Sequence, residues 1–164
     1  MSTIDDLKAA FAGESQANRK YLAFAEKAEK DGYPQIARLF RAAAAAETVH
    51  AHAHLRAMDG VYSTAENLQA AIDGENYEYV SMYPQFIAAA IAEGNKRALR
   101  SFEYAMAVEQ EHELLYSNAL ATLDQEQEAY DYYVCPVCGH THPRCAPETC
   151  PVCGVPGSRF MHVE

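Results

Sequence analysis

The chain has 164 residues, enough for one medium-sized domain and a small appendage. Its formal net charge of −10 at pH 7 argues against nucleic acid or an anionic membrane surface as a partner. No apolar run reaches the roughly 18 residues that a membrane span needs, and the N-terminus lacks the features of a secretory signal. The five cysteines all follow residue 134 and four form Cys-x-x-Cys pairs, which predicts metal ligation in a reducing cytoplasm rather than disulfides.

Four long helices are predicted in chain order, over residues of about 2–30, 34–60, 63–94 and 95–125. A glycine closes each of the first three, and Ser63-x-x-Glu66 has the pattern of a capping box. Because the connections are short, neighbouring helices are expected to be antiparallel. The expected fold class for residues 1–125 is therefore an all-α four-helix bundle.

The first and second helix pairs form an internal repeat. Five aromatic, acidic and histidine positions recur 62 residues later, as Tyr21/Tyr83, Phe24/Phe86, Phe40/Phe102, Glu47/Glu109 and His50/His112. The pair Glu14/Glu75 recurs at an offset of 61, so the third predicted helix gains one residue between Glu75 and Tyr83. We expect that residue to form a π-bulge beside Glu78, a feature often found at functional sites. A duplicated hairpin related by a pseudo-twofold would place two equivalent half-sites face to face.

Carboxylates interrupt the apolar stripe of every predicted helix, and those stripes carry no Lys or Arg. Burying a carboxylate costs several kcal/mol unless it is paired or binds a cation. Each Glu-x-x-His motif places both side chains on one helical face, and carboxylates with imidazole suit a pair of iron or manganese ions. Surface carboxylates that merely fall in register are the alternative, which the repetition disfavours. The candidate ligands are Glu14, Glu47, His50, Glu75, Glu78, Glu109 and His112.

A second metal site is predicted in the tail. Residues 126–131 form a polar, acidic linker, and residues 132–164 have too little apolar content to fold unaided. Two Cys-Pro-Val-Cys-Gly knuckles lie in this tail, each able to grip one ion with two thiolates. They predict a tetrahedral site for iron, or for zinc as in zinc ribbons. The four candidate thiolate ligands are Cys135, Cys138, Cys150 and Cys153.

Other reactive side chains near these motifs are expected to be bystanders. Cys145 is expected to be a free loop thiol, with a spare-ligand or redox role as the alternative. His52 and His54 are expected at the helix surface or bundle end rather than as ligands. The histidines near the four cysteines are also expected at the surface; they are His140, His142 and His162.

Taken together, these motifs resemble the rubrerythrin family, whose members join a ferritin-like non-haem di-iron bundle to a rubredoxin-like domain. The resemblance covers nearly the whole chain: a bundle at 1–125, a linker at 126–131 and a four-cysteine domain at 132–164. The bundle motifs that carry it are Glu14, Glu47-x-x-His50, Gly74-Glu75-x-x-Glu78, Met82-Tyr83-Pro84 and Glu109-x-x-His112. In the tail it rests on the short loop between the knuckles and on Ala146-Pro147-Glu148.

The resemblance implies a peroxidase that reduces hydrogen peroxide to water with electrons delivered through the rubredoxin-like iron. It implies two irons in the bundle, with manganese or zinc as possible substitutes, and one iron or zinc in the tail. Two rival functions are ferroxidase or oxidase activity at the same centre, and iron binding or storage with a structural zinc ribbon.

By the same resemblance, Glu47 and Glu109 bridge the irons, whereas Glu14 and Glu75 are terminal ligands. His112 binds one iron. On the other iron, Glu78 and His50 are alternatives that exchange when the redox state changes. Tyr21 and Tyr83 match family tyrosines that hydrogen-bond ligand carboxylates, with core packing as the alternative. The residues expected to take part in catalysis are Glu78, His50, Tyr21 and Tyr83.

The expected partners are hydrogen peroxide and an electron-donor protein, either a reductase or a rubredoxin. A homodimer or larger assembly is also expected. The tail leaves from the end of the fourth predicted helix, roughly 15–20 Å from a mid-bundle site at about 1.5 Å per residue. A head-to-tail partner would bring its own four-thiolate site closer.

Overall fold

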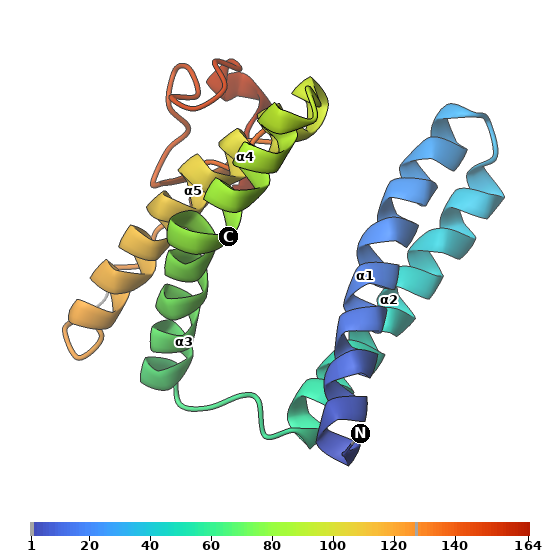
Figure 1. Ribbon diagram of the computed structural model, residues 1–164, viewed down its shortest axis with the longest axis horizontal. Coiled ribbons are helices and arrows are strands. Elements are labelled where there is room, and N and C mark those ends of the chain that lie inside the picture. Colours follow the sequence, from blue (N-terminus) through green and yellow to red (C-terminus); the bar gives the residue numbers. More distant parts are fainter. Residues whose placement is uncertain (1, 127) are drawn as a thin grey trace. The chain divides into compact units, whose positions relative to one another are not determined.

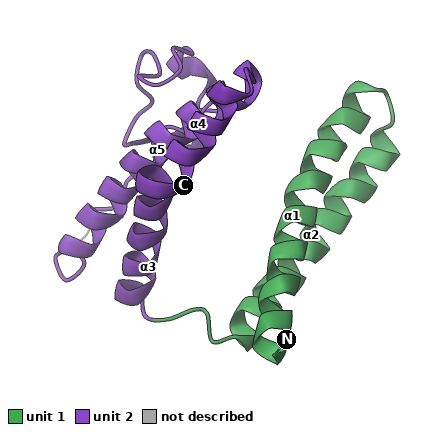
Figure 2. Cartoon of the chain, in the orientation of Figure 1, with its two compact units in different colours: residues 1–62 green, residues 63–164 purple. Residues whose placement is uncertain are grey.

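The computed structural model describes residues 2–126 and 128–164 (Figure 1). The chain divides into two compact units, residues 1–62 and 63–164 (Figure 2). None of the helices in the described ranges is long and apolar enough to cross a membrane. The predicted linker at 126–131 includes residue 127, which lies outside the described residues, and the predicted domain boundaries stay a prediction.

The first unit is a hairpin of helices α1 (Thr3–Lys30) and α2 (Pro34–Ala57). A capping box that the sequence analysis missed begins α1: the Ser2 hydroxyl accepts the Asp5 N–H, and the Asp5 carboxylate accepts the Ser2 N–H. Gly32, with a φ of +82°, makes the turn after α1. Both predicted helices are therefore present, and local capping and turn signals account for their ends.

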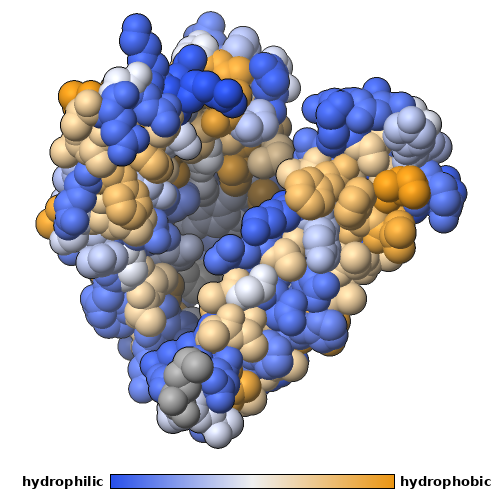
Figure 3. All heavy atoms as spheres, turned by 45° about the vertical axis from the view of Figure 1, so that its right-hand side comes forward, coloured by the Kyte–Doolittle hydropathy of each residue, from blue (hydrophilic) through white to orange (hydrophobic). Residues whose placement is uncertain are grey.

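Alanine side chains form the contact between α1 and α2. Ala25, Ala37 and Ala44 are at most 1% exposed, and such small residues let the two backbones approach closely. Buried Asn18 ties the helices together, since its amide donates to the Ala44 carbonyl at 2.7 Å and to the Thr48 hydroxyl at 2.8 Å. Larger apolar residues of both helices stay exposed, and Figure 3 shows apolar patches among hydrophilic side chains.

The second unit begins with a helical hairpin interrupted once. Its elements are α3 (Thr64–Tyr77), the π-helical segment η1 (Glu78–Met82), α4 (Tyr83–Ala92) and α5 (Lys96–Ala121). The capping box predicted at Ser63 and Glu66 is present. The predicted π-bulge is confirmed as well: η1 begins at Glu78, and the Tyr83 N–H donates to the Glu78 carbonyl five residues earlier.

The internal repeat is also a repeat of side-chain packing. In the first unit, the rings of Phe24 and Phe40 lie 5.5 Å apart and Tyr21 lies 6.1 Å from Phe40. The equivalent distances in the second unit are 5.5 Å and 6.2 Å; they join Phe86 to Phe102 and Tyr83 to Phe102. The same aromatic trio therefore recurs in each hairpin, and both tyrosines pack against aromatic neighbours.

The tail folds as a small sheet, which the sequence analysis did not predict. Strands β1 (Tyr132–Val134), β2 (Thr141–Pro143) and β3 (Met161–Val163) form an antiparallel sheet in the order β2-β1-β3. A short 3₁₀ helix, η2 (Gly157–Arg159), precedes β3. At Gly157 a Cβ would lie 1.7 Å from the Pro147 carbonyl oxygen, so only glycine fits there. The core of this domain is built around buried Cys135, Cys150 and Val155.

Candidate metal centres

The first ligand group lies within the α1–α2 hairpin. Glu14 of α1 and the Glu47-x-x-His50 motif of α2 each present a ligand atom, and these atoms lie within 4.8 Å of one another. The His50 Nδ1 is 2.8 Å from a Glu47 carboxylate oxygen. Helical spacing explains this contact, because residues three apart share a face. The His50 side chain is 56% exposed, whereas that of Glu47 is 17% exposed.

The second ligand group lies within the α3–α5 unit. Glu75 of α3 and the Glu109-x-x-His112 motif of α5 bring their ligand atoms within 4.8 Å of one another. The His112 Nδ1 is 3.0 Å from a Glu109 oxygen and 3.7 Å from a Glu75 oxygen. The His112 side chain is 26% exposed, less than half the value of His50. Glu78 lies one turn beyond Glu75, at the start of η1.

The second group carries more negative charge than its surroundings favour. Burial, reinforced by the charge of Glu109, raises the pKa of Glu75 to about 7. Burial and Glu109 also raise the pKa of Glu78. Burial and the charges of Glu78 and Glu109 raise the pKa of the Tyr83 hydroxyl. A cation would relieve this repulsion, so the donor set and its electrostatics both fit a metal ion.

The four cysteine sulfurs converge on one point. All four Sγ atoms lie within 4.8 Å of one another, and the Cys135–Cys153 and Cys138–Cys150 pairs are each 3.5 Å apart. Tetrahedral thiolates about 2.3 Å from an ion would be separated by about 3.8 Å. The spacing therefore fits a single four-coordinate ion.

Backbone geometry shapes each cysteine knuckle. Gly139 and Gly154 follow the second cysteine of each pair with φ of +87° and +77°, which L side chains rarely adopt. Each donates its N–H to the carbonyl of the first cysteine of its own knuckle. Burial opposes ionisation of Cys135, but N–H groups of the knuckle outweigh it and lower the pKa of this thiol to about 7. A metal ion would complete this deprotonation.

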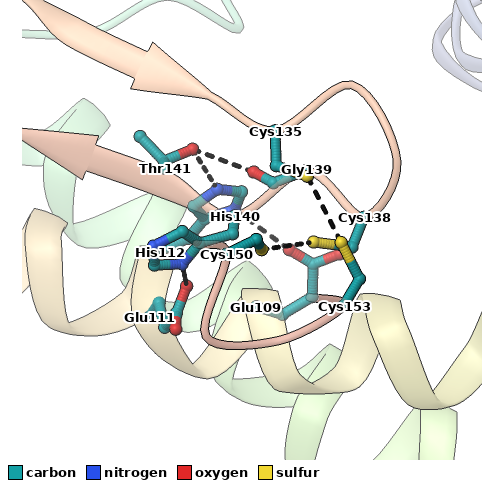
Figure 4. Close-up of polar contacts among 10 residues, drawn as sticks. All are labelled: Glu109, Glu111, His112, Cys135, Cys138, Gly139, His140, Thr141, Cys150 and Cys153. Atoms are coloured by element: carbon teal, nitrogen blue, oxygen red, sulfur yellow. Dashed lines mark hydrogen bonds and ion pairs between the residues drawn. The ribbon is translucent and has the colours of Figure 1, made fainter. Parts of the chain in front are cut away.

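The four-cysteine domain packs against α5 beside the second ligand group (Figure 4). His140 is 6% exposed and its Nδ1 is hydrogen-bonded to the Glu111 carboxylate, so the prediction that His140 lies at the surface is wrong. The His112 Nε2 is 3.0 Å from the Thr141 hydroxyl. The tail thus folds back along α5, so that Thr141 contacts His112 of its own chain, a contact that the expected distance from the end of the helix did not include.

The remaining candidates lie outside the three ligand groups. Cys145 is exposed and apart from the four converging thiols, as expected of a loop thiol. His52 is exposed and His54 half-buried, and neither belongs to a ligand group among the described residues. Thr141, Glu111 and His140 were not among the predicted site residues, because no local spacing marks a contact between distant segments.

Comparisons with known proteins match both parts of the chain. A family model described as Rubrerythrin matches residues 5–120, and one described as Rubrerythrin, rubredoxin-like domain matches residues 133–161. Rubrerythrin-2 of Clostridium acetobutylicum is 36% identical, with 97% of this chain and 95% of the relative covered. Nigerythrin of Nitratidesulfovibrio vulgaris is 39% identical, with 97% and 85% covered.

Solved structures agree with these matches. The fully reduced, all-ferrous state of nigerythrin is similar with a TM-score of 0.60 and 38% identity, covering 99% of this chain and 87% of that one. The mixed-valence state of nigerythrin gives a TM-score of 0.59. The predicted fold class, a helical bundle followed by a rubredoxin-like four-cysteine domain, is confirmed.

Proposed function

The chain belongs to the rubrerythrin family, and we propose that within this family it is a peroxidase that reduces hydrogen peroxide to water. The observation that carries the proposal is the combination, in one chain, of two Glu–Glu–His groups with a four-thiolate group. Such a combination suits a protein that accepts single electrons at the four-thiolate site and uses two of them at the Glu–Glu–His groups to reduce its substrate. The balanced reaction consumes two electrons and two protons for each peroxide and yields two waters.

The donor sets and the family matches support iron at both kinds of site. We propose that one iron is held by Glu14, Glu47 and His50, and another by Glu75, Glu109 and His112. The four converging cysteines would hold the third. The bridging roles of Glu47 and Glu109 stay a prediction, as do manganese or zinc as substitutes in the bundle.

Bound iron would supply the one-electron redox changes that peroxide reduction needs, and the neighbouring side chains would hold and donate protons. The Tyr83 phenol is protonated at neutral pH, and burial and three neighbouring carboxylates raise its pKa further. A protonated phenol can donate a hydrogen bond to a carboxylate or pass a proton towards a departing oxygen. We therefore assign Tyr83 a proton-holding role and propose the same for Tyr21, its counterpart in the repeat.

The exchange of Glu78 and His50 is the finer part of the proposal. A carboxylate suits ferric iron, whereas neutral imidazole is acceptable to ferrous iron. Two observations support an unusual role for Glu78: it begins the π-helical segment, and it has no counterpart in the first hairpin, where the repeat runs one residue shorter. Glu78 and His50 are therefore the residues that we expect to change partners during turnover.

Stopped-flow mixing tests the peroxidase proposal. The reduced protein is mixed anaerobically with hydrogen peroxide and, separately, with dioxygen. In a peroxidase, the reduced iron should be oxidised at least about tenfold faster by peroxide than by dioxygen at equal concentration. That ratio corresponds to a difference of about 1.4 kcal/mol in the activation barrier. Faster reaction with dioxygen would favour the ferroxidase or oxidase alternative instead.

Metal analysis separates electron transfer from a structural role for the tail. Iron bound by four thiolates should make the protein red and should bleach on reduction. Cys138→Ser should abolish that colour while the helical content, measured by circular dichroism, stays unchanged. A colourless native protein with zinc in the tail would support the iron-storage alternative with a structural zinc ribbon.

We propose a small redox protein, a reductase or a rubredoxin, as the electron donor. The homodimer and the cytoplasmic location stay predictions. The distance argument for a dimer is weaker than the sequence suggested, because the tail contacts His112 of its own chain. Sedimentation of the active protein measures the oligomeric state directly, and a monomer with full turnover would remove the need for a partner copy.

A further inference from the structure

The four-cysteine domain contacts α5 at three neighbouring points, and Figure 4 shows those at His140 and Thr141. The buried His140 is hydrogen-bonded to Glu111. The backbone at Gly139 lies against Val108, which is 3% exposed and whose methyl group would be 3.7 Å from a Cβ placed there. The third point is Thr141, whose hydroxyl meets His112. A histidine–carboxylate hydrogen bond, an apolar contact and a histidine–hydroxyl hydrogen bond thus fix the orientation of the knuckle on the helix.

The two ring nitrogens of His112 face different partners. Nδ1 faces the carboxylates of Glu109 and Glu75 at 3.0 and 3.7 Å. Nε2 lies 3.0 Å from the Thr141 Oγ1, and that oxygen is 3.1 Å from the Gly139 carbonyl. A hydroxyl has one proton, and the Gly139 carbonyl can only accept a hydrogen bond from it. The Thr141 oxygen is therefore placed to accept a hydrogen bond from Nε2–H. A cation bound among the carboxylates would then take the place of the proton with which Nδ1 otherwise faces Glu109.

We propose that Thr141 of the four-cysteine domain is a positioning residue for His112, fixing the tautomer and ring orientation with which that histidine binds metal. The inference rests on the proposed function, which makes His112 an iron ligand. Histidine ligands generally donate their second ring N–H to a fixed acceptor, and losing that acceptor weakens metal binding. Here the acceptor belongs to a different metal domain from the ligand that it holds.

The surroundings offer Nε2 few other acceptors. His112 and Thr141 line a cavity of about 380 Å³ whose other walls are mainly apolar and include Leu68, Leu115, Val134 and Val163. Replacing the hydroxyl of Thr141 with a methyl group would extend the apolar wall. The imidazole would then lose the acceptor that holds its ring.

The test compares ferrous iron binding in the full-length protein and its variants. Anaerobic competition with a chelator measures the affinity of the non-thiolate iron, while the thiolate absorption band reports an intact tail. Thr141→Val keeps the shape but removes the hydroxyl, and should weaken binding about 10–100-fold. Thr141→Ser should restore most of the affinity. Thr149→Val, at an exposed position of the same domain, is the matched control and should bind as the native protein does.

Three outcomes would overturn the proposal. Native affinity in Thr141→Val, with the thiolate band intact, would mean that the hydroxyl does not position His112. Equal losses in the valine and serine variants would mean that the hydroxyl is not what holds His112, because serine keeps it. His112→Ala tests whether His112 is an iron ligand at all. If this variant binds iron as the native protein does, the ligand assignment itself fails. If His112→Ala loses iron but Thr141→Val does not, only the role of Thr141 is refuted.

A measurement on the native chain does not depend on any variant. The zinc-loaded protein is diamagnetic, so the ring nitrogens of ¹⁵N-labelled histidines can be assigned by NMR. The proposal requires His112 to carry its proton on Nε2 and its metal on Nδ1. The opposite tautomer would overturn it even if Thr141→Val failed to fold.

Discussion

The two ligand groups of this protein are copies of one pattern, yet they differ in how firmly they are held. In both groups the histidine Nδ1 lies within hydrogen-bonding distance of a carboxylate oxygen of the glutamate three residues earlier, at 2.8 Å for His50 and 3.0 Å for His112. Within its own unit, however, His50 is more than half exposed, whereas His112 is held on its second nitrogen by Thr141. If both histidines bind metal as proposed, His112 would be the more firmly held of the two and His50 the one that can exchange.

A second difference is the residue inserted in α3–α4. Up to Glu75 the hairpins match at an offset of 61, and from Tyr83 onwards they match at 62. The extra residue is absorbed in η1, which begins with Glu78. The second hairpin thus carries a carboxylate, Glu78, that the first hairpin lacks, and the two-fold repeat becomes chemically asymmetric.

The largest expected effect comes from replacing the glutamates predicted to bridge the two irons. Glu47→Ala and Glu109→Ala should each weaken binding of the non-thiolate iron at least roughly a hundredfold, or about 2.7 kcal/mol, since each removes a predicted bridging ligand. Iron stoichiometry after gel filtration measures this loss. Near-native stoichiometry in only one of the variants would show that just one of these glutamates is a bridge.

Next in size is the contrast between the two histidines. His112→Ala should lose iron in both redox states, because it removes a ligand that is held in place. His50→Ala should still bind two ferric irons but react with peroxide at least about tenfold more slowly, because only its reduced form lacks a ligand. Single-turnover rates, measured alongside iron content, compare the two. A native rate in His50→Ala would reduce His50 to a spectator.

The inserted residue can be removed to make the two hairpins equal. Deleting Val80, which is 52% exposed, should convert η1 into ordinary α-helix and restore a uniform offset. We expect helical content to remain but the peroxide reaction to slow about tenfold, because Glu78 would change its position relative to Tyr83. Val80→Ala, which keeps the chain length, is the control. An unchanged rate in the deletion variant would deny η1 a role in turnover.

The smallest expected effect is a pH dependence of the metal-free protein. The pKa of Glu75 is about 7 in the folded state, against a usual value of 4.5. Between these pH values the folded chain retains a proton that the unfolded chain has lost, so stability should fall as pH rises from about 4.5 to 7. Because Glu75 is partly exposed, screening limits the effect to about 1 kcal/mol, or a few degrees in Tm.

Thermal unfolding of the metal-free protein at pH 5 and pH 8 measures that difference. Glu75→Gln should reduce it, since the amide does not titrate. Saturating metal should reverse its sign, because metal ions bind the carboxylate form. A native protein that is equally stable at both pH values would contradict the charge crowding inferred at the second group.

Features with a local signal were predictable from the sequence. Helix ends follow from Ser63 and Pro34, and the aromatic trios follow from their spacing. The π-helix was predictable because the second hairpin has one more residue than the first, and a continuous helix can accommodate one extra residue as a π-bulge. The donor sets were predictable too, since the Glu-x-x-His spacing places both side chains on one face of a helix and the Cys-x-x-Cys spacing places both thiols in one turn.

Features that depend on docking were not predictable in this way. Strands of three residues have no useful periodicity, and β2 is a Thr-His-Pro segment that ordinary strand propensity disfavours. His140 looks like a surface residue until the tail folds onto Glu111. The contact of Thr141 with His112 joins residues 29 apart through a tertiary interface, so no spacing rule could reveal it.

The hydrogen bond from the Cys135 N–H to the His140 carbonyl closes the first knuckle just before Thr141. A domain this small depends on its ion to hold such a turn. We therefore expect Thr141 to reach its place beside α5 only when the four thiolates hold their ion. On the proposed role of Thr141, the tail would take its metal first, and the second ligand group would become a tight site afterwards. Cells short of the tail's metal would then accumulate chains whose bundle is helical but poorly able to retain iron.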